Sequence, residues 1–133
     1  MQDKPKDRRK HTRVSLKLGA ELQLDDSVPV SGTIKNISFS GAFMYCLNPA
    51  NIPVGRTGLL KIILQPDPHI NIIIFRCEVV RIDESGAGIR FINIDINGYQ
   101  QFKNLMIYNS TDPDALLAEL EKNPGLDIYR GNQ

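Results

Sequence analysis

Residues 16–24 have the sequence LKLGAELQL, in which apolar side chains occupy every second position. These are Leu16, Leu18, Ala20, Leu22 and Leu24, and polar residues stand between most of them. Successive side chains of a strand point to opposite faces of the sheet, so this alternation predicts a strand that buries one face.

Further strands are expected on the carboxyl side of this segment. Short runs rich in Val, Ile, Leu and Thr occur there, separated by the turn-forming residues Gly, Pro, Asn and Asp. We expect them at residues 33–37, 42–45, 58–64, 71–83 and 87–91. In the longest, Ile74, Arg76, Glu78 and Val80 should lie on one face, with Phe75, Cys77, Val79 and Arg81 on the other. Five or six antiparallel strands with no helix between them predict an all-β fold, a closed or nearly closed small barrel.

The carboxyl end changes to a helical period. Tyr99, Phe102, Leu105 and Met106 predict a helix over residues 97–108, capped by Asp95 or Asn97. A second helix should start after Asp112, since Pro113 suits a first helical position, and should end at Asn123-Pro124-Gly125. Its apolar stripe is Leu116, Leu117 and Leu120, and both stripes are expected to pack on the barrel.

Length and composition exclude several classes of protein. A chain of 133 residues, 41% hydrophobic and 23% charged, is typical of one globular domain, not of a disordered chain or a disulfide scaffold. It has no apolar run long enough to span a bilayer, and its first ten residues do not resemble a secretory signal, so we expect a cytoplasmic protein. Cys46, Cys77, His11 and His69 are too scattered for a metal site, and the two cysteines are predicted to be buried free thiols.

The positive charge is concentrated at the amino terminus. Residues 1–13 carry a net charge of +4 and the remaining 120 residues a net charge of −3. A basic segment ahead of a nearly neutral body suggests an anionic partner, although a solvated, flexible tail has the same composition.

Two short motifs suggest what this partner is. Arg9 and Arg13 form R-x-x-x-R, and Asn36, Ser38 and Gly41 form N-x-S-x-x-G about 22 residues later. Either motif alone is weak, since Asn, Ser and Gly are also ordinary turn formers. In this order, ahead of the first strand and at the end of a later one, they resemble the signature of the PilZ domain, the bacterial receptor module for cyclic di-GMP.

The resemblance covers roughly residues 7–108 and includes Gly88-Ile89-Arg90-Phe91, which is similar to a late strand of the family. It implies a six-stranded antiparallel β-barrel with helices at its carboxyl end. The expected organisation is a flexible basic arm at residues 1–13, a barrel with one helix at 14–108, and a helix with a tail at 109–133.

The chemistry of the ligand explains the residue types in the motifs. Cyclic di-GMP carries two phosphates and two guanines, and the planar guanidinium of Arg9 or Arg13 can donate to both N7 and O6 of a guanine. Asn36 and Ser38, two residues apart on a strand, should face the same ligand, while Gly41 allows a positive φ or a close backbone approach. The family more often has Asp at position 36, so Asn36 should affect affinity more than binding itself.

Arg8 stands immediately before R-x-x-x-R. In PilZ domains an arginine at this position appears with a stacked pair of ligands, so the resemblance implies up to two cyclic di-GMP molecules per chain. A solvated basic side chain is the alternative for Arg8.

No catalytic motif is present, and we therefore expect a binding protein, not an enzyme. The leading hypothesis is a cyclic di-GMP receptor that relays binding to a protein partner, whose identity the sequence does not give. The alternatives are a single-stranded nucleic-acid binder, disfavoured because the body is acidic and Phe39 and Tyr45 are the only aromatics near the motif, and a PilZ-like adaptor that binds no nucleotide.

Overall fold

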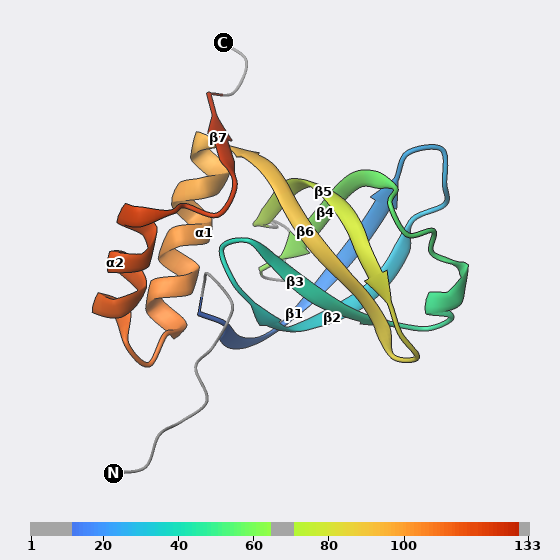
Figure 1. The fold of residues 1–133 in the computed structure, drawn as a ribbon, viewed down its shortest axis with the longest axis horizontal. Coiled ribbons are helices and arrows are strands. Elements are labelled where there is room, and N and C mark those ends of the chain that lie inside the picture. The colour runs from blue at the N-terminus through green and yellow to red at the C-terminus, as the bar shows by residue number, and fades with distance from the viewer. Residues whose placement is uncertain (1–11, 65–70, 131–133) are drawn as a thin grey trace.

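Six antiparallel strands form a closed barrel in the computed structural model, which describes residues 12–64 and 71–130 (Figure 1). They are β1 (Val14–Leu24), β2 (Val30–Ile37), β3 (Gly41–Cys46), β4 (Thr57–Ile63), β5 (Ile72–Ile82) and β6 (Gly86–Asp95). The strand order is β3-β2-β1-β4-β5-β6, and pairing of β3 with β6 closes the barrel. A 3-10 turn, η1 (Pro49–Asn51), lies between β3 and β4. The predicted six-stranded barrel is confirmed.

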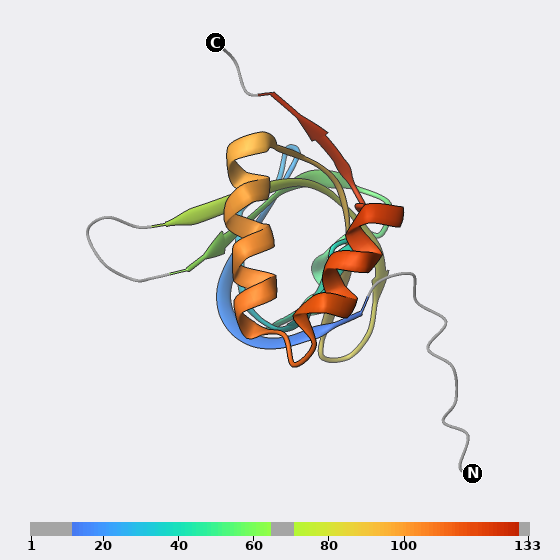
Figure 2. The ribbon, with the colours of Figure 1, turned by 90° about the vertical axis from the view of Figure 1, so that its left-hand side faces the viewer.

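Helices α1 (Ile96–Asn109) and α2 (Pro113–Lys122) follow β6 and lie together across one end of the barrel (Figure 2). Helix α1 begins one residue before the predicted position 97, with Asp95 as its cap, and α2 begins at Pro113 as predicted. The Asp95 carboxylate accepts from Gly98 N–H at 2.6 Å, and the Asp112 carboxylate accepts from Ala115 N–H at 3.2 Å. Such caps satisfy amide groups that have no partner within the helix.

A short strand, β7 (Asp127–Tyr129), was not predicted and lies outside the barrel. It runs parallel to β6 and pairs with Asn93–Asp95. Strand β6 therefore pairs with β3 in its first half and with β7 in its second half.

The core is formed by the inward faces of the strands and by the apolar stripe of α1. In β1, Leu18, Ala20, Leu22 and Leu24 are all buried, as their alternation predicts. The rings of Phe75 and Phe91 stack with centroids 3.9 Å apart, and Phe102 of α1 packs on Phe75 at 4.9 Å. Burial of these large rings fastens α1 to the barrel.

Two apolar residues differ from their predicted environments. Leu117 belongs to the expected stripe of α2 but is 36% exposed, because Leu116 and Leu120 alone face the core. Phe39, considered as an aromatic available near the motif, is fully buried, with its ring 4.9 Å from that of Phe102. The turn between β2 and β3 is thereby held on α1.

The two cysteines also differ from each other. Cys77 is buried, as predicted, and its burial raises the pKa of the thiol to about 12. Cys46 is only partly buried, so the prediction of two buried thiols is wrong for this residue.

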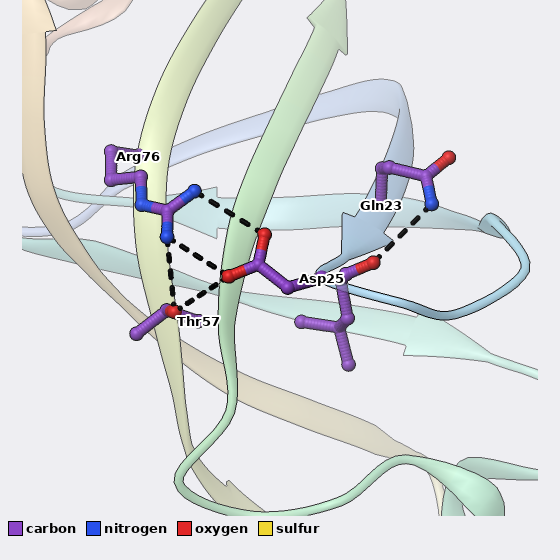
Figure 3. Close-up of polar contacts among 5 residues, drawn as sticks. Gln23, Asp25, Thr57 and Arg76 are labelled. Carbon is purple, nitrogen blue, oxygen red and sulfur yellow. Dashed lines mark hydrogen bonds and ion pairs between the residues drawn. The ribbon is translucent and has the colours of Figure 1, made fainter.

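A polar cluster on the barrel surface joins three strands (Figure 3). The Arg76 guanidinium of β5 donates to both oxygens of Asp25, at 3.0 and 3.4 Å, and to the Thr57 hydroxyl at 3.1 Å. Thr57 at the start of β4 in turn donates to Asp25 at 3.0 Å, directly after the end of β1. Hydrogen bonds from Arg76 and then Thr57 lower the pKa of the Asp25 carboxyl. We call Asp25, Thr57 and Arg76 the surface clamp.

The chain entering β1 contacts α2. Thr12 donates its backbone N–H to one Glu119 carboxylate oxygen at 2.8 Å and its hydroxyl to the other.

No helix in the described part of the chain is long and apolar enough to cross a membrane.

Candidate functional site

A cavity of about 460 Å³ opens on the outer surface of the barrel, where β2, β3, β5 and β6 meet. Four of the predicted site residues line it: Arg13, Asn36, Ser38 and Gly41. The rest of the lining comes from β3, β5, β6 and the β5–β6 turn, and includes Phe43, Tyr45, Arg81, Asp83 and Arg90. Arg8 and Arg9 lie outside the residues that the structure describes.

Arg13 is exposed and directly precedes Val14, the first residue of β1. Its backbone lies between two fixed points, since Thr12 is bonded to Glu119 and Val14 belongs to the sheet. Among the described residues, its guanidinium has no ion-pair partner. The side chain is therefore available to an anion or a purine edge in the cavity.

Asn36 lies on β2 opposite Ser15 of β1. Its amide oxygen accepts a hydrogen bond from the Ser15 hydroxyl at 3.2 Å. Within the described part of the chain no hydrogen bond engages the Asn36 amide NH₂, so the side chain offers the cavity a donor.

Ser38 was expected to extend from a strand beside Asn36, and this prediction is wrong. Strand β2 ends at Ile37, and Ser38 belongs to the turn that leads into β3. Its backbone N–H donates to Gly41 O at 2.9 Å, and its hydroxyl lies 3.1 Å from that of Ser40 while also accepting from Ser40 N–H at 3.2 Å. A serine that bonds its own turn holds the backbone of the loop, and Ser38 is only 8% exposed.

Gly41 was expected to allow either a positive φ or a close approach of two backbones, and the structure shows the close approach. Its φ is not positive, whereas a Cβ at this position would lie 2.3 Å from the Ile89 carbonyl oxygen of β6. The close approach is thus required for β3 to pair with β6, where Gly41 faces Arg90. This glycine closes the barrel beside the cavity.

Arg81 lines the cavity because of a β-bulge. The sequence pattern places it on the same face as Cys77 and Val79; these two are buried and Arg81 is exposed, so that prediction is wrong. The β5–β6 register shifts between Val79, which faces Ile89, and Arg81, which faces Gly88. The extra residue, Val80, turns the strand so that the Arg81 side chain is 56% exposed. Bulges commonly redirect side chains next to functional sites.

Rings and cations lie close together in this part of the lining, and Lys35 of β2, which is outside the lining, contacts one of the rings. The Arg81 guanidinium lies 5.0 Å from the centre of the Phe43 ring, and the Phe43 and Tyr45 rings are 4.9 Å apart. Lys35 Nζ lies 4.8 Å from the centre of the Tyr45 ring. Arg90 forms an ion pair with Glu78 across β5 and β6 at 2.6 Å. The two binding motifs do not include these residues, although Tyr45 is near them in the sequence and Arg90 belongs to Gly88-Ile89-Arg90-Phe91. For Arg81 the available signal was an arginine predicted to share a face with Cys77 and Val79.

Asp83 follows β5 and is held by the turn into β6. Its carboxylate accepts from Ser85 N–H at 2.8 Å, from the Ser85 hydroxyl at 3.0 Å and from Gly86 N–H at 3.1 Å. The Ser85 backbone N–H contributes most to lowering the pKa of the Asp83 carboxyl. The cavity therefore holds a fixed carboxylate beside its arginines.

The sequence model of the PilZ domain matches residues 7–108. Comparison with curated protein sequences found no match. Thirteen chains of solved structures match, and the three described next are similar at sequence identities that show the fold alone.

The inhibitor of motility of Bacillus subtilis (MotI/DgrA) has a TM-score of 0.63 and 20% identity. This alignment covers 79% of the present chain and 52% of the other, so the present chain spans about half the length of that protein. The PilZ domain with c-di-GMP of YcgR from Escherichia coli has a TM-score of 0.62 and 16% identity, covering 87% and 97%. The PilZ domain of CeSA from a cellulose-synthesizing bacterium has a TM-score of 0.56 and 16% identity, covering 73% and 96%.

Proposed function

The chain belongs to the PilZ domain family, and from this premise we propose that it is a cyclic di-GMP receptor that relays ligand binding to a protein partner. One observation carries the proposal: Arg13 and the three motif residues of the β2–β3 region line a single cavity although they are separated by more than 20 positions. The similar YcgR domain was solved with c-di-GMP. The protein acts by binding, not by catalysis.

The two motifs have different tasks in this proposal. Arg9 and Arg13 supply planar guanidinium groups that donate to guanine N7 and O6 or to phosphate oxygens. Asn36 donates from its amide NH₂, because its oxygen is bonded to Ser15. Ser38 and Gly41 hold the loop and the strand pairing that shape the wall.

We base the proposed relay to the partner on Thr12 and Arg13, the described end of the basic arm at residues 1–13. Its last two residues connect the cavity to α2 through Arg13 and the Thr12–Glu119 contacts. A ligand that engages Arg9 and Arg13 orders the arm and so changes the surface next to α2, where a partner protein can detect it.

Calorimetric titration with cyclic di-GMP tests the proposal. Arg9→Ala and Arg13→Ala should each weaken binding by about 5-fold to over 100-fold, the effect of losing one bidentate contact. Lys17→Ala is the matched control, since Lys17 is an exposed cation of β1 outside the cavity, and it should bind like the wild type.

A parallel titration with a single-stranded oligonucleotide tests the alternatives. Binding of the oligonucleotide without binding of cyclic di-GMP would replace the receptor by a nucleic-acid binder. Binding of neither would make the protein an adaptor that has no nucleotide ligand.

The ratio of ligand to protein tests the role proposed for Arg8. A stacked pair of ligands brings four phosphates together, and a third arginine can answer this charge. We expect about two ligands per chain, falling towards about one in Arg8→Leu while binding through Arg9 and Arg13 persists. A wild-type ratio of one would contradict this part of the proposal.

A further inference from the structure

Arg81 lines the same cavity as the motif residues Arg13, Asn36, Ser38 and Gly41, and the fold holds its side chain in place. The aliphatic part of the side chain lies over Gly88, where a Cβ would be 2.8 Å from Arg81 Cγ and 3.0 Å from Nε. The Phe43 ring of β3, on the other side of β6, has its centre 5.0 Å from the guanidinium carbon. Because Gly88, opposite the bulge, has no side chain, the Arg81 side chain can pack directly on the backbone of β6.

Most hydrogen-bond donors of Arg81 have no partner among the residues that the structure describes. Its one ion pair in the described part of the chain, from Nη1 to Asp83, measures 3.5 Å and is too long for a good hydrogen bond. A guanidinium carries five N–H donors in a fixed plane. Arg81 therefore presents a positioned donor fork to whatever enters the cavity.

The surroundings of this fork favour a base over a phosphate. The Asp83 carboxylate is fixed by Ser85 and Gly86 within ion-pair distance of Arg81, and its negative charge repels a phosphate approaching the same place. A guanine edge is uncharged, and its N7 and O6 match two parallel N–H donors. The nearby rings of Phe43 and Tyr45 offer apolar surface to a planar base.

We propose that Arg81 is a specificity-determining residue that donates a bidentate hydrogen bond to N7 and O6 of a guanine of the bound cyclic di-GMP. The proposal rests on the proposed function and adds to it a contact from β5 that lies outside both motifs.

The test pairs protein variants with a ligand analogue in which 7-deazaguanine replaces guanine, which removes N7 and leaves both phosphates. Wild type, Arg81→Ala, Arg81→Lys and Arg76→Ala are each titrated with both ligands. Arg76→Ala is the matched control, because it removes the same charge from the same strand outside the cavity.

With cyclic di-GMP, Arg81→Ala and Arg81→Lys should each lose about 5-fold to over 100-fold in affinity, since lysine cannot form the fork, and Arg76→Ala should be unchanged. The deaza analogue should bind the wild type more weakly than cyclic di-GMP does. That penalty should shrink at least about threefold in Arg81→Ala, because the contact to N7 has already gone.

Three outcomes would overturn the inference: unchanged affinity in Arg81→Ala, full retention of affinity in Arg81→Lys, or an undiminished deaza penalty in Arg81→Ala. In each case, weakened binding by Arg13→Ala would leave the proposed function standing. Absence of cyclic di-GMP binding by the wild type would instead remove both.

Discussion

Arg76 and Arg81 stand five residues apart on β5, and each has an aspartate partner, yet their environments differ. Arg76 makes three hydrogen bonds within the surface clamp, to both Asp25 oxygens and to Thr57. Arg81 reaches Asp83 with one contact of 3.5 Å, and Asp83 obtains its hydrogen bonds from the turn. The same residue type on one strand makes three hydrogen bonds at one position and only one long ion pair at the other, among the described residues.

The difference identifies which arginine serves the fold and which can serve a ligand. The Arg76 guanidinium uses its donors within the protein, where the clamp joins the end of β1 and the start of β4 to β5. An open guanidinium in a cavity contributes little to folding and keeps its donors for binding. The count of unused donors on a positioned arginine is therefore a better guide to function than exposure, since the side chains of Arg76 and Arg81 are both more than one-third exposed.

Two glycines give the largest contrast between these regions. Gly58 follows Thr57 of the clamp, and a Cβ there would lie 2.3 Å from Gln23 O and 2.6 Å from Leu24 Cα, both backbone atoms of β1. Because backbone cannot move aside cheaply, Gly58→Ala should lower the free energy of unfolding by about 1–3 kcal/mol. Urea denaturation measures this loss, with Gly19→Ala as control because a Cβ at Gly19 meets nothing within 4 Å. Equal stability of the two variants would contradict the prediction.

Gly88→Ala should act on binding instead. The atoms that its Cβ meets belong to the Arg81 side chain, which can rotate away without moving the strand. We expect about a tenfold loss of cyclic di-GMP affinity, equivalent to about 1.4 kcal/mol, and a free energy of unfolding within about 1 kcal/mol of the wild type. Calorimetry and urea denaturation of the same sample separate the two effects. A loss of stability without a loss of affinity would show that ligand binding by Arg81 does not depend on its packing against Gly88.

The smallest effect concerns acid stability. The folded pKa of Asp25 is lowered chiefly by Arg76, so its contribution is complete above the ordinary value of 3.8 and is lost as pH falls through the folded value. Arg76→Ala should reduce the fall in thermal midpoint between about pH 5 and about pH 2. Arg81→Ala should leave that fall almost unchanged, because the Ser85 backbone N–H is the main cause of the lowered Asp83 pKa. If the thermal midpoint fell equally in Arg76→Ala and Arg81→Ala over this pH range, the proposed difference between the two arginines would be contradicted.

Side-chain alternation and capping patterns predicted most of the fold. The alternation of β1 placed its buried face correctly, and Asp95 and Asp112 marked the starts of both helices. These features depend on residues close together in the sequence. Strand β7, with three residues and a pairing that depends on β6, has no comparable local signal.

Only part of the candidate site was predicted from the sequence, because the rest depends on residues that are far apart in the chain. Arg13, Asn36, Ser38 and Gly41 form compact motifs, whereas Arg81 enters the cavity through a register shift between β5 and β6. A period of two cannot anticipate an inserted residue, so the pattern assigned Arg81 to the wrong face. Phe39 was misjudged because its burial depends on the Phe102 ring of α1, more than 60 positions away.

The Thr12–Glu119 contacts join residues 107 positions apart, one beside the cavity-lining Arg13 and the other on α2. Thermodynamic linkage makes such a connection reciprocal: if a ligand at Arg13 strengthens the hold of Thr12 on Glu119, it stabilises α2 by the same free energy. If a partner protein binds α2 and preserves the contact, the ligand would raise the affinity for that partner by some factor. The partner would then raise the affinity for the ligand by the same factor. One carboxylate would thus set the coupling between messenger and partner.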